Sequence, residues 1–218
     1  MRINKIFYAL SIYLIGNILL RMFLNIFIDN ENILIYSIGL LICQILILIP
    51  IYLINKDDIT SMFKDFKINY QKYLKLAFVF WIFGFLIMLS LNYLINYLIL
   101  DEAMLSTNEE AVRDFLFKYP LYSIIAIPLL VPIIEELVFR LSFNGIKNKY
   151  LFILLTSSLF AFLHILADLN SPLALYFFPY LTIGLVFSLS YYKTKNIFSG
   201  IIIHIWHNTL TLILIFLF

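Results

Sequence analysis

Residues 33–54 read ILIYSIGLLICQILILIPIYLI, a run of 22 positions without a charged side chain. A helix needs about 20 mainly apolar residues to cross the hydrocarbon layer of a bilayer, which is roughly 30 Å thick. Lipid offers the backbone no hydrogen-bond partners, so a segment of this kind folds as a helix that satisfies its own peptide groups. This stretch therefore predicts a membrane-spanning helix.

Segments of the same kind recur along the rest of the chain, at residues 6–28, 76–100, 119–143, 150–167, 172–192 and 197–218. The composition agrees, because 63% of the residues are hydrophobic and 13% are charged, whereas soluble domains carry about 25% charged residues. The single cysteine, Cys43, excludes a disulfide within the chain. We predict an all-α, polytopic membrane bundle of about seven transmembrane helices, which forms one integral membrane domain over residues 1–218.

The positive charges between these segments gather on one side of the predicted membrane. That side holds Arg2, Lys5, Lys56, Lys64, Lys67, Lys72, Lys75, Lys147, Lys149, Lys193 and Lys195, whereas the other side holds Arg113 and Lys118. Because cytoplasmic loops carry the excess of lysine and arginine, we predict a cytoplasmic N-terminus and an external C-terminus. The basic, aromatic-rich residues 56–75 suit a helix on the anionic cytoplasmic surface. Heavy use of Ile, Asn, Lys, Tyr and Phe hints at an AT-rich prokaryotic genome, so we expect a multi-pass protein of a prokaryotic plasma membrane.

Few ionisable side chains lie inside the predicted spans, and each is costly there, so each needs a reason. They are Arg21, Glu135, Glu136, Arg140, His164, His204 and His207. Only Arg21 belongs to the N-terminal half. The C-terminal half is therefore where the sequence points to chemistry.

The acidic pair belongs to the stretch PIIEELVFR, which ends at Arg140. Glu136 and Arg140 are four positions apart on one helix face and are predicted to form a salt bridge. Glu135 lies about 100° around the helix and is left free. A free carboxylate in a low-dielectric site has a raised proton affinity, as a general base working near neutral pH requires.

Two prolines, Pro128 and Pro132, precede the acidic pair. They are expected to kink the helix and to free backbone carbonyls just before the glutamates. A plainer interpretation of the pair is that both glutamates lie at the cytoplasmic boundary and reach water there.

The later spans supply imidazoles and an amide. The 150–167 segment carries Phe160 followed four residues later by His164, and the last segment carries His204 followed four residues later by Asn208. His204 and Asn208 share a helix face and offer hydrogen-bond donors that suit an oxyanion. His207 is turned away from Asn208, and we give it no role. Taken alone, His164 is better explained as a hydrogen-bonded core histidine.

The glutamate pair with arginine four residues on, then Phe-x-x-x-His, then His-x-x-x-Asn, closely resembles the CPBP family over residues 119–210. This family comprises the CAAX proteases and bacteriocin-processing enzymes, also called Abi proteins, which are intramembrane glutamic endopeptidases. The resemblance implies that Glu135 activates water, His164 positions it, and His204 and Asn208 stabilise the oxyanion. Glu136, Arg140 and Phe160 would then be structural support, Gly184 would allow close helix packing, and no cofactor would be needed.

Other interpretations remain open from the sequence. Glu135, His164 and His204 would also suit a zinc ion with water as its fourth ligand. A non-catalytic bacteriocin-immunity or peptide-binding protein, or a small transporter, is a further alternative. The expected partners are the lipid bilayer and a membrane-associated peptide or protein substrate, such as a bacteriocin leader or a signalling peptide, and no nucleic acid.

Overall fold

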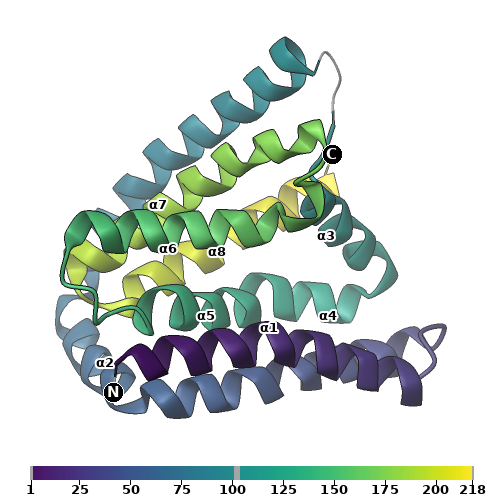
Figure 1. Ribbon diagram of the computed structural model, residues 1–218, viewed down its shortest axis with the longest axis horizontal. Coiled ribbons are helices and arrows are strands. Elements are labelled where there is room, and N and C mark those ends of the chain that lie inside the picture. The colour runs from purple at the N-terminus through teal and green to yellow at the C-terminus, as the bar shows by residue number, and fades with distance from the viewer. Residues whose placement is uncertain (1, 101–103, 218) are drawn as a thin grey trace.

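The computed structural model describes residues 2–100 and 104–217, which consist of helices and their connections and contain no strand (Figure 1). Four helical stretches in this part of the chain are long and apolar enough to cross a membrane: Asn4–Phe27, Ile33–Ile99, Pro172–Thr194 and Ile197–Leu217. The prediction of an all-α, polytopic membrane bundle is confirmed. The count of seven spans stays a prediction, and Phe218, the last residue of the seventh, lies outside the described residues.

Two spans that the sequence separates belong to one helix. After α1 (Arg2–Phe27), helix α2 (Ile33–Leu94) continues into a π-helical turn, η1 (Ile95–Ile99). A straight helix of 62 residues would be about 93 Å long, far longer than a bilayer is thick. Figure 1 shows that α2 instead bends, so that its first part lies beside α1 and its last part rises on the opposite side of the bundle. The residues between 55 and 75 include neither glycine nor proline, so nothing in this basic segment breaks the helix.

The acidic pair lies on a helix with two π-helical interruptions. Helix α3 (Thr107–Lys118) leads into α4 (Pro120–Ile125), η2 (Ala126–Leu130), α5 (Val131–Glu136) and η3 (Leu137–Leu141). The Val131 N–H donates to the Ala126 carbonyl, five residues back, and Pro132 has no N–H to donate. The Ile127 carbonyl therefore loses both of its helical partners, as the prolines led us to expect.

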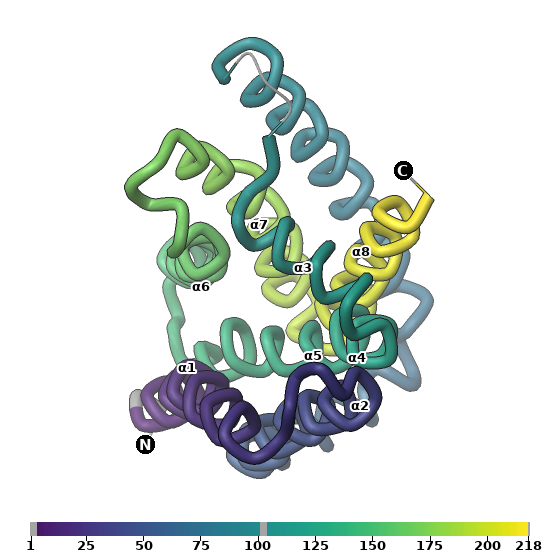
Figure 2. Tube along the Cα trace, turned by 90° about the vertical axis from the view of Figure 1, so that its right-hand side faces the viewer, coloured from purple at the N-terminus to yellow at the C-terminus, as the bar shows by residue number. Residues whose placement is uncertain are grey.

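The remaining helices complete the bundle. They are α6 (Lys149–His164), the 3-10 turns η4 (Leu166–Asp168) and η5 (Pro172–Tyr176), α7 (Phe177–Thr194) and α8 (Ile197–Leu217). Figure 2 views the molecule from the end at which α3 lies, with α6 seen almost along its axis.

The lysine-rich end of the bundle is tied together by polar contacts between distant parts of the chain. Asp58 pairs with Lys5 at 3.0 Å and accepts from the Asn144 amide at 3.3 Å. The Asn196 amide, in the turn between α7 and α8, donates to Asp65 at 2.9 Å. The N-terminus, the middle of α2 and two helix connections therefore meet at one end, as the predicted alternation of loops requires.

The opposite end has its own contacts. The Thr107 backbone N–H, at the start of α3, donates to the Asp168 carboxylate at 3.2 Å. The Tyr176 hydroxyl donates to Asn96, near the end of the long α2 stretch, at 2.5 Å, and the Tyr119 hydroxyl donates to a carbonyl of the turn between α1 and α2. This end, called the α3 end below, joins the connections that the sequence places on the other side of the membrane.

Candidate active site

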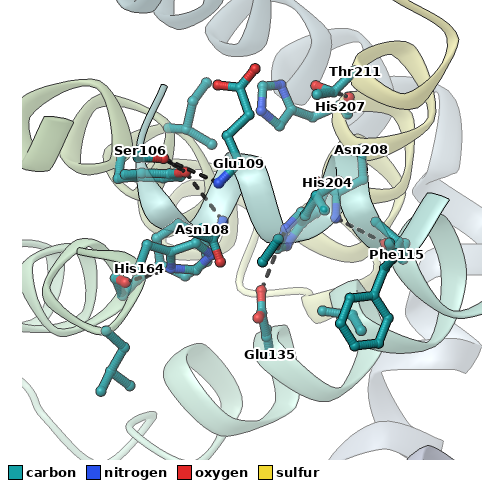
Figure 3. A pocket seen from close by; sticks show the side chains of 18 of the residues that line it. Ser106, Asn108, Glu109, Phe115, Glu135, His164, His204, His207, Asn208 and Thr211 are labelled. Atoms are coloured by element: carbon teal, nitrogen blue, oxygen red, sulfur yellow. Dashed lines mark hydrogen bonds and ion pairs between the residues drawn. The ribbon is translucent and has the colours of Figure 1, made fainter. Parts of the chain in front are cut away.

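A cavity of about 630 Å³ lies between the helices, and residues from α1, α2, α3, the α4–α5 segment, α6, α7 and α8 line it. Glu135, His164, His204 and Asn208 all contribute to its wall, as Figure 3 shows. The four residues come from three segments separated by up to about seventy positions in sequence. The structure thus brings the candidate catalytic residues around one space.

The ion pair predicted within the α5–η3 segment is present. Arg140 Nη1 lies 3.0 Å from Glu136 Oε1, and both side chains are fully buried. Arg140 also donates to the Gly184 carbonyl of α7 at 3.2 Å. Its guanidinium lies 4.8 Å from the ring centre of Phe160 and 5.5 Å from that of Phe187. Arg140 therefore holds α5, α6 and α7 together through one buried charge.

Two glycines allow this arrangement. A β-carbon at Gly184 would lie 3.0 Å from the Ser157 carbonyl oxygen, so α6 and α7 approach closely there, as the resemblance to the CPBP family implied. A β-carbon at Gly200 of α8 would lie 2.7 Å from Glu136 Oε2. Gly200 was not among the predicted residues, although it precedes His204 by one helical turn on the same face.

Glu135 points away from the Arg140 pair, as predicted. The prediction that its carboxylate has no partner is wrong. Its Oε1 accepts a hydrogen bond from the Tyr13 hydroxyl of α1 at 3.0 Å, and its Oε2 lies 3.7 Å from His204 Nε2. The side chain is almost completely buried. Tyr13 was not among the predicted site residues, because a single tyrosine in an apolar span does not indicate a functional site. The spacing of Tyr13, Asn17 and Arg21, four residues apart, was the available sign of a polar stripe on α1.

His204 connects the two glutamates, which the sequence did not predict. Its Nδ1 lies 3.0 Å from Glu136 Oε1, while its Nε2 faces Glu135. A carboxylate that is paired with arginine can only accept, so Nδ1 donates this bond and Nε2 remains directed at the cavity. The imidazole stacks on Phe187 with 4.1 Å between ring centres. Its orientation is thereby fixed from two sides.

Asn208 supplies the partner that the Ile127 carbonyl lacks. Its Nδ2 donates to that oxygen at 3.0 Å, which joins α8 to the π-helical turn η2. An amide NH₂ group carries two hydrogens, so one donor is left over at the cavity wall. Asn208 therefore makes a structural contact that its spacing from His204 did not predict.

His164 is the last residue of α6, and its Nδ1 lies 2.8 Å from the Phe160 carbonyl oxygen. A carbonyl only accepts, so Nδ1 carries the hydrogen and Nε2 is the acceptor of the neutral ring. Within the described chain, no hydrogen bond or ion pair joins His164 to Glu135 or His204. The Phe160 ring packs against both histidines, at 4.2 Å from His164 and 5.8 Å from His204.

The zinc alternative stays a hypothesis, and the geometry bears on it at one point in the part of the chain that the structure describes. No three histidine, cysteine, aspartate or glutamate side chains there are grouped so that they would hold a metal ion. His207, which we gave no role, lines the cavity, and its Nδ1 accepts from Trp81 Nε1 at 3.4 Å.

The chain is similar to a known protein family and to two bacterial proteins. Residues 117–210 match the family model of Rce1-like type II CAAX prenyl endopeptidases. The UPF0177 protein YxdF of Lactococcus lactis subsp. lactis (strain IL1403) is 31% identical over 131 residues, which cover 58% of this chain and 71% of that protein. The "Putative membrane peptidase YdiL" of Bacillus subtilis (strain 168) is 27% identical over 184 residues, covering 81% of this chain and 69% of that protein. No solved structure matches.

Proposed function

Because the chain belongs to the family of Rce1-like CAAX endopeptidases, we propose that it is an intramembrane endopeptidase that cleaves a membrane-associated peptide or protein by a glutamate-activated water. The observation that carries this proposal is the placement of Glu135. Its carboxylate is kept apart from the Arg140 pair, is held by Tyr13, and lies on the wall of a cavity that His164, His204 and Asn208 also line.

The proposed reaction needs only groups that the chain supplies. Glu135 takes a proton from water, and the water oxygen forms a bond to the peptide carbonyl carbon. His164 helps to position the water through its Nε2. His204, when protonated at Nε2, and the second amide hydrogen of Asn208 donate to the oxyanion. Glu135 then passes its proton to the leaving nitrogen as the C–N bond breaks.

The Glu136–Arg140 pair acts indirectly in this scheme. It leaves Glu135 as the carboxylate without an arginine partner on its own helix, and Glu136 fixes His204 through Nδ1. We propose that the reaction requires neither a metal nor another cofactor. Full activity in the presence of a strong chelator is the expected result, and loss of activity that zinc restores would favour the zinc-dependent version.

The biological role proposed for this activity is maturation of a peptide or immunity against a bacteriocin. A strain that carries Glu135→Ala is expected to accumulate an uncleaved membrane peptide, which mass spectrometry of the membrane fraction would identify. A wild-type strain and one with Glu109→Ala, a change elsewhere in the same cavity, serve as controls. An immunity phenotype that survives Glu135→Ala, with no accumulated precursor, would instead favour a binding protein.

Tyr13 is proposed as a positioning residue for Glu135. Tyr13→Phe keeps the ring, which packs edge-on against Phe139, and removes only the hydroxyl. Loss of a hydrogen bond to a charged group is worth about 1.5–3 kcal/mol, so kcat is expected to fall about 10- to 100-fold with little change in KM. Tyr36→Phe, which loses a hydroxyl contact to Asn25 away from the cavity, is the matched control. An unchanged kcat would remove Tyr13 from the mechanism.

A further inference from the structure

The cavity is displaced toward the α3 end of the bundle. On α6 only Phe160, Leu163 and His164, all near the end of the helix, line it, and on α8 the lining begins at His204 and continues toward the C-terminus. On α7 it is lined near the start of the helix, up to Ile183. Helices α6, α7 and α8 thus contribute from the half that lies nearer α3, and α3 itself lines the space with several residues (Figure 3). The α4–α5 segment lines the cavity from Tyr122, close to α3, down to Glu135.

The lysine-rich end contributes nothing to the lining. None of the lining residues comes from 55–75, from the connection between η3 and α6, or from the turn between α7 and α8, all of which the structure describes. These segments meet at the end where Lys5 pairs with Asp58. In Figure 1 that end lies on the left with the N-terminus, and α3 lies on the right. The cavity therefore opens away from the positive charges.

Charge then assigns the two ends to the two sides of the membrane. The excess of lysine and arginine marks the cytoplasmic side. The α3 end carries the acidic residues Glu109, Glu110, Asp114 and Asp168 and has few positive charges. By this rule the cavity faces the outer side of the membrane.

Some residues of the cavity wall are also exposed on the outside of the molecule. They are Leu14 and Ile18 of α1, 40% and 60% exposed, and Leu166 of η4, 52% exposed. Ala111 of α3 is exposed as well. These side chains are apolar, whereas the interior wall holds Glu135 and the histidines. Leu14, Ile18 and Leu166 form a rim that faces lipid more favourably than water. Ala111 lies beside the exposed Glu110 and Asp114 of α3, so it marks the part of the mouth that meets water.

We propose that substrate enters this cavity from the outer leaflet, through an apolar mouth formed by α1, α3 and η4. The substrate would be an outward-facing peptide whose apolar segment lies in the outer leaflet while its scissile bond reaches Glu135. That the entering molecule is a substrate rests on the proposed function. The location and the accessibility of the mouth do not depend on it, so they can be tested without an activity assay.

Cysteine labelling in intact cells tests this proposal. In a Cys43→Ala background, single substitutions Ala111→Cys and Asn17→Cys place a thiol at the mouth and inside the cavity. A membrane-impermeant maleimide added outside is expected to label both. Lys64→Cys, at the lysine-rich end, is expected to react only after the cells are permeabilised. Phe23→Cys, 62% exposed on the same helix as Asn17 but away from the cavity, is the lipid-facing control and is expected to stay unreactive.

Each contrary result has a defined meaning when the variants are compared at equal amounts in the membrane. Labelling of Lys64→Cys in intact cells, with Ala111→Cys protected, would overturn the orientation. Labelling of Ala111→Cys without Asn17→Cys would overturn an open path from the outside to the cavity. Neither result depends on cleavage, so a failure here is distinct from a failure of the protease proposal.

Discussion

A Glu135→Gln variant is expected to keep the fold and to cleave substrate about 10²- to 10⁴-fold more slowly than the wild type, the range typical for loss of a general base. Glutamine has nearly the same shape as glutamate, and its amide oxygen can still accept from the Tyr13 hydroxyl, which is 3.0 Å from Glu135 in the structure. It cannot take a proton from water. The rate of cleavage by purified protein in lipid, measured on the peptide identified in the cell experiment, is the readout.

Glu109→Gln is the matched control for this substitution. Glu109 lines the same cavity, but it pairs with Arg113 of its own helix at 3.1 Å, and both side chains are partly exposed. Its amide variant is expected to cleave at close to the wild-type rate. Equal losses in the two variants would mean that the cavity needs negative charge in general, and undiminished cleavage by Glu135→Gln would exclude Glu135 as the base.

Arg140→Met is expected to lower the free energy of unfolding by about 3–5 kcal/mol, because removal of one partner leaves a buried charge uncompensated. Glu136 would keep its carboxylate in a fully buried site, and the Gly184 carbonyl would lose its donor. The Phe160 and Phe187 rings would also lose the cation that lies between them. Denaturant titration of the wild type and of Arg140→Met in mild detergent measures the difference in the free energy of unfolding.

The chain offers a second pair with the same spacing for comparison. Glu109 and Arg113 are also four residues apart, but their side chains are about one third exposed, so Arg113→Met is expected to cost less than about 1 kcal/mol. The double variant Glu136→Gln/Arg140→Met removes both charges and is expected to regain part of the lost stability. Similar small losses for Arg140→Met and Arg113→Met would contradict the view of Arg140 as the link between helices.

Local patterns in the sequence predicted the features that depend on local spacing. The Glu136–Arg140 contact follows from a four-residue separation on one helix, and the lack of a partner at the Ile127 carbonyl follows from the nearby prolines. The alternation of lysine-rich and lysine-poor connections agrees with the way the two ends of the bundle are assembled. These predictions rest on helix geometry and on the cost of charge in lipid, which are both readable from the chain.

Contacts between distant helices were not predictable in the same way. The bond from Tyr13 to Glu135 and the bond from His204 to Glu136 join residues 122 and 68 positions apart, and no spacing rule relates such residues. The hydropathy of 33–54 and 76–100 indicates two spans, but it does not reveal that the helix continues through the polar residues between them. That continuity depends on the lack of glycine and proline in the polar stretch, which hydropathy does not measure.

The Tyr13 hydroxyl of α1 affects how much of the chain the Glu135 site requires. The region shared with the family starts at residue 117, yet the hydrogen-bond partner of Glu135 belongs to residue 13. A protein trimmed to the shared region would keep all the recognisable motifs and would lack a side chain that fixes the acid. Among relatives, the first helix is therefore expected to vary in sequence while some residue on it preserves a donor at that depth.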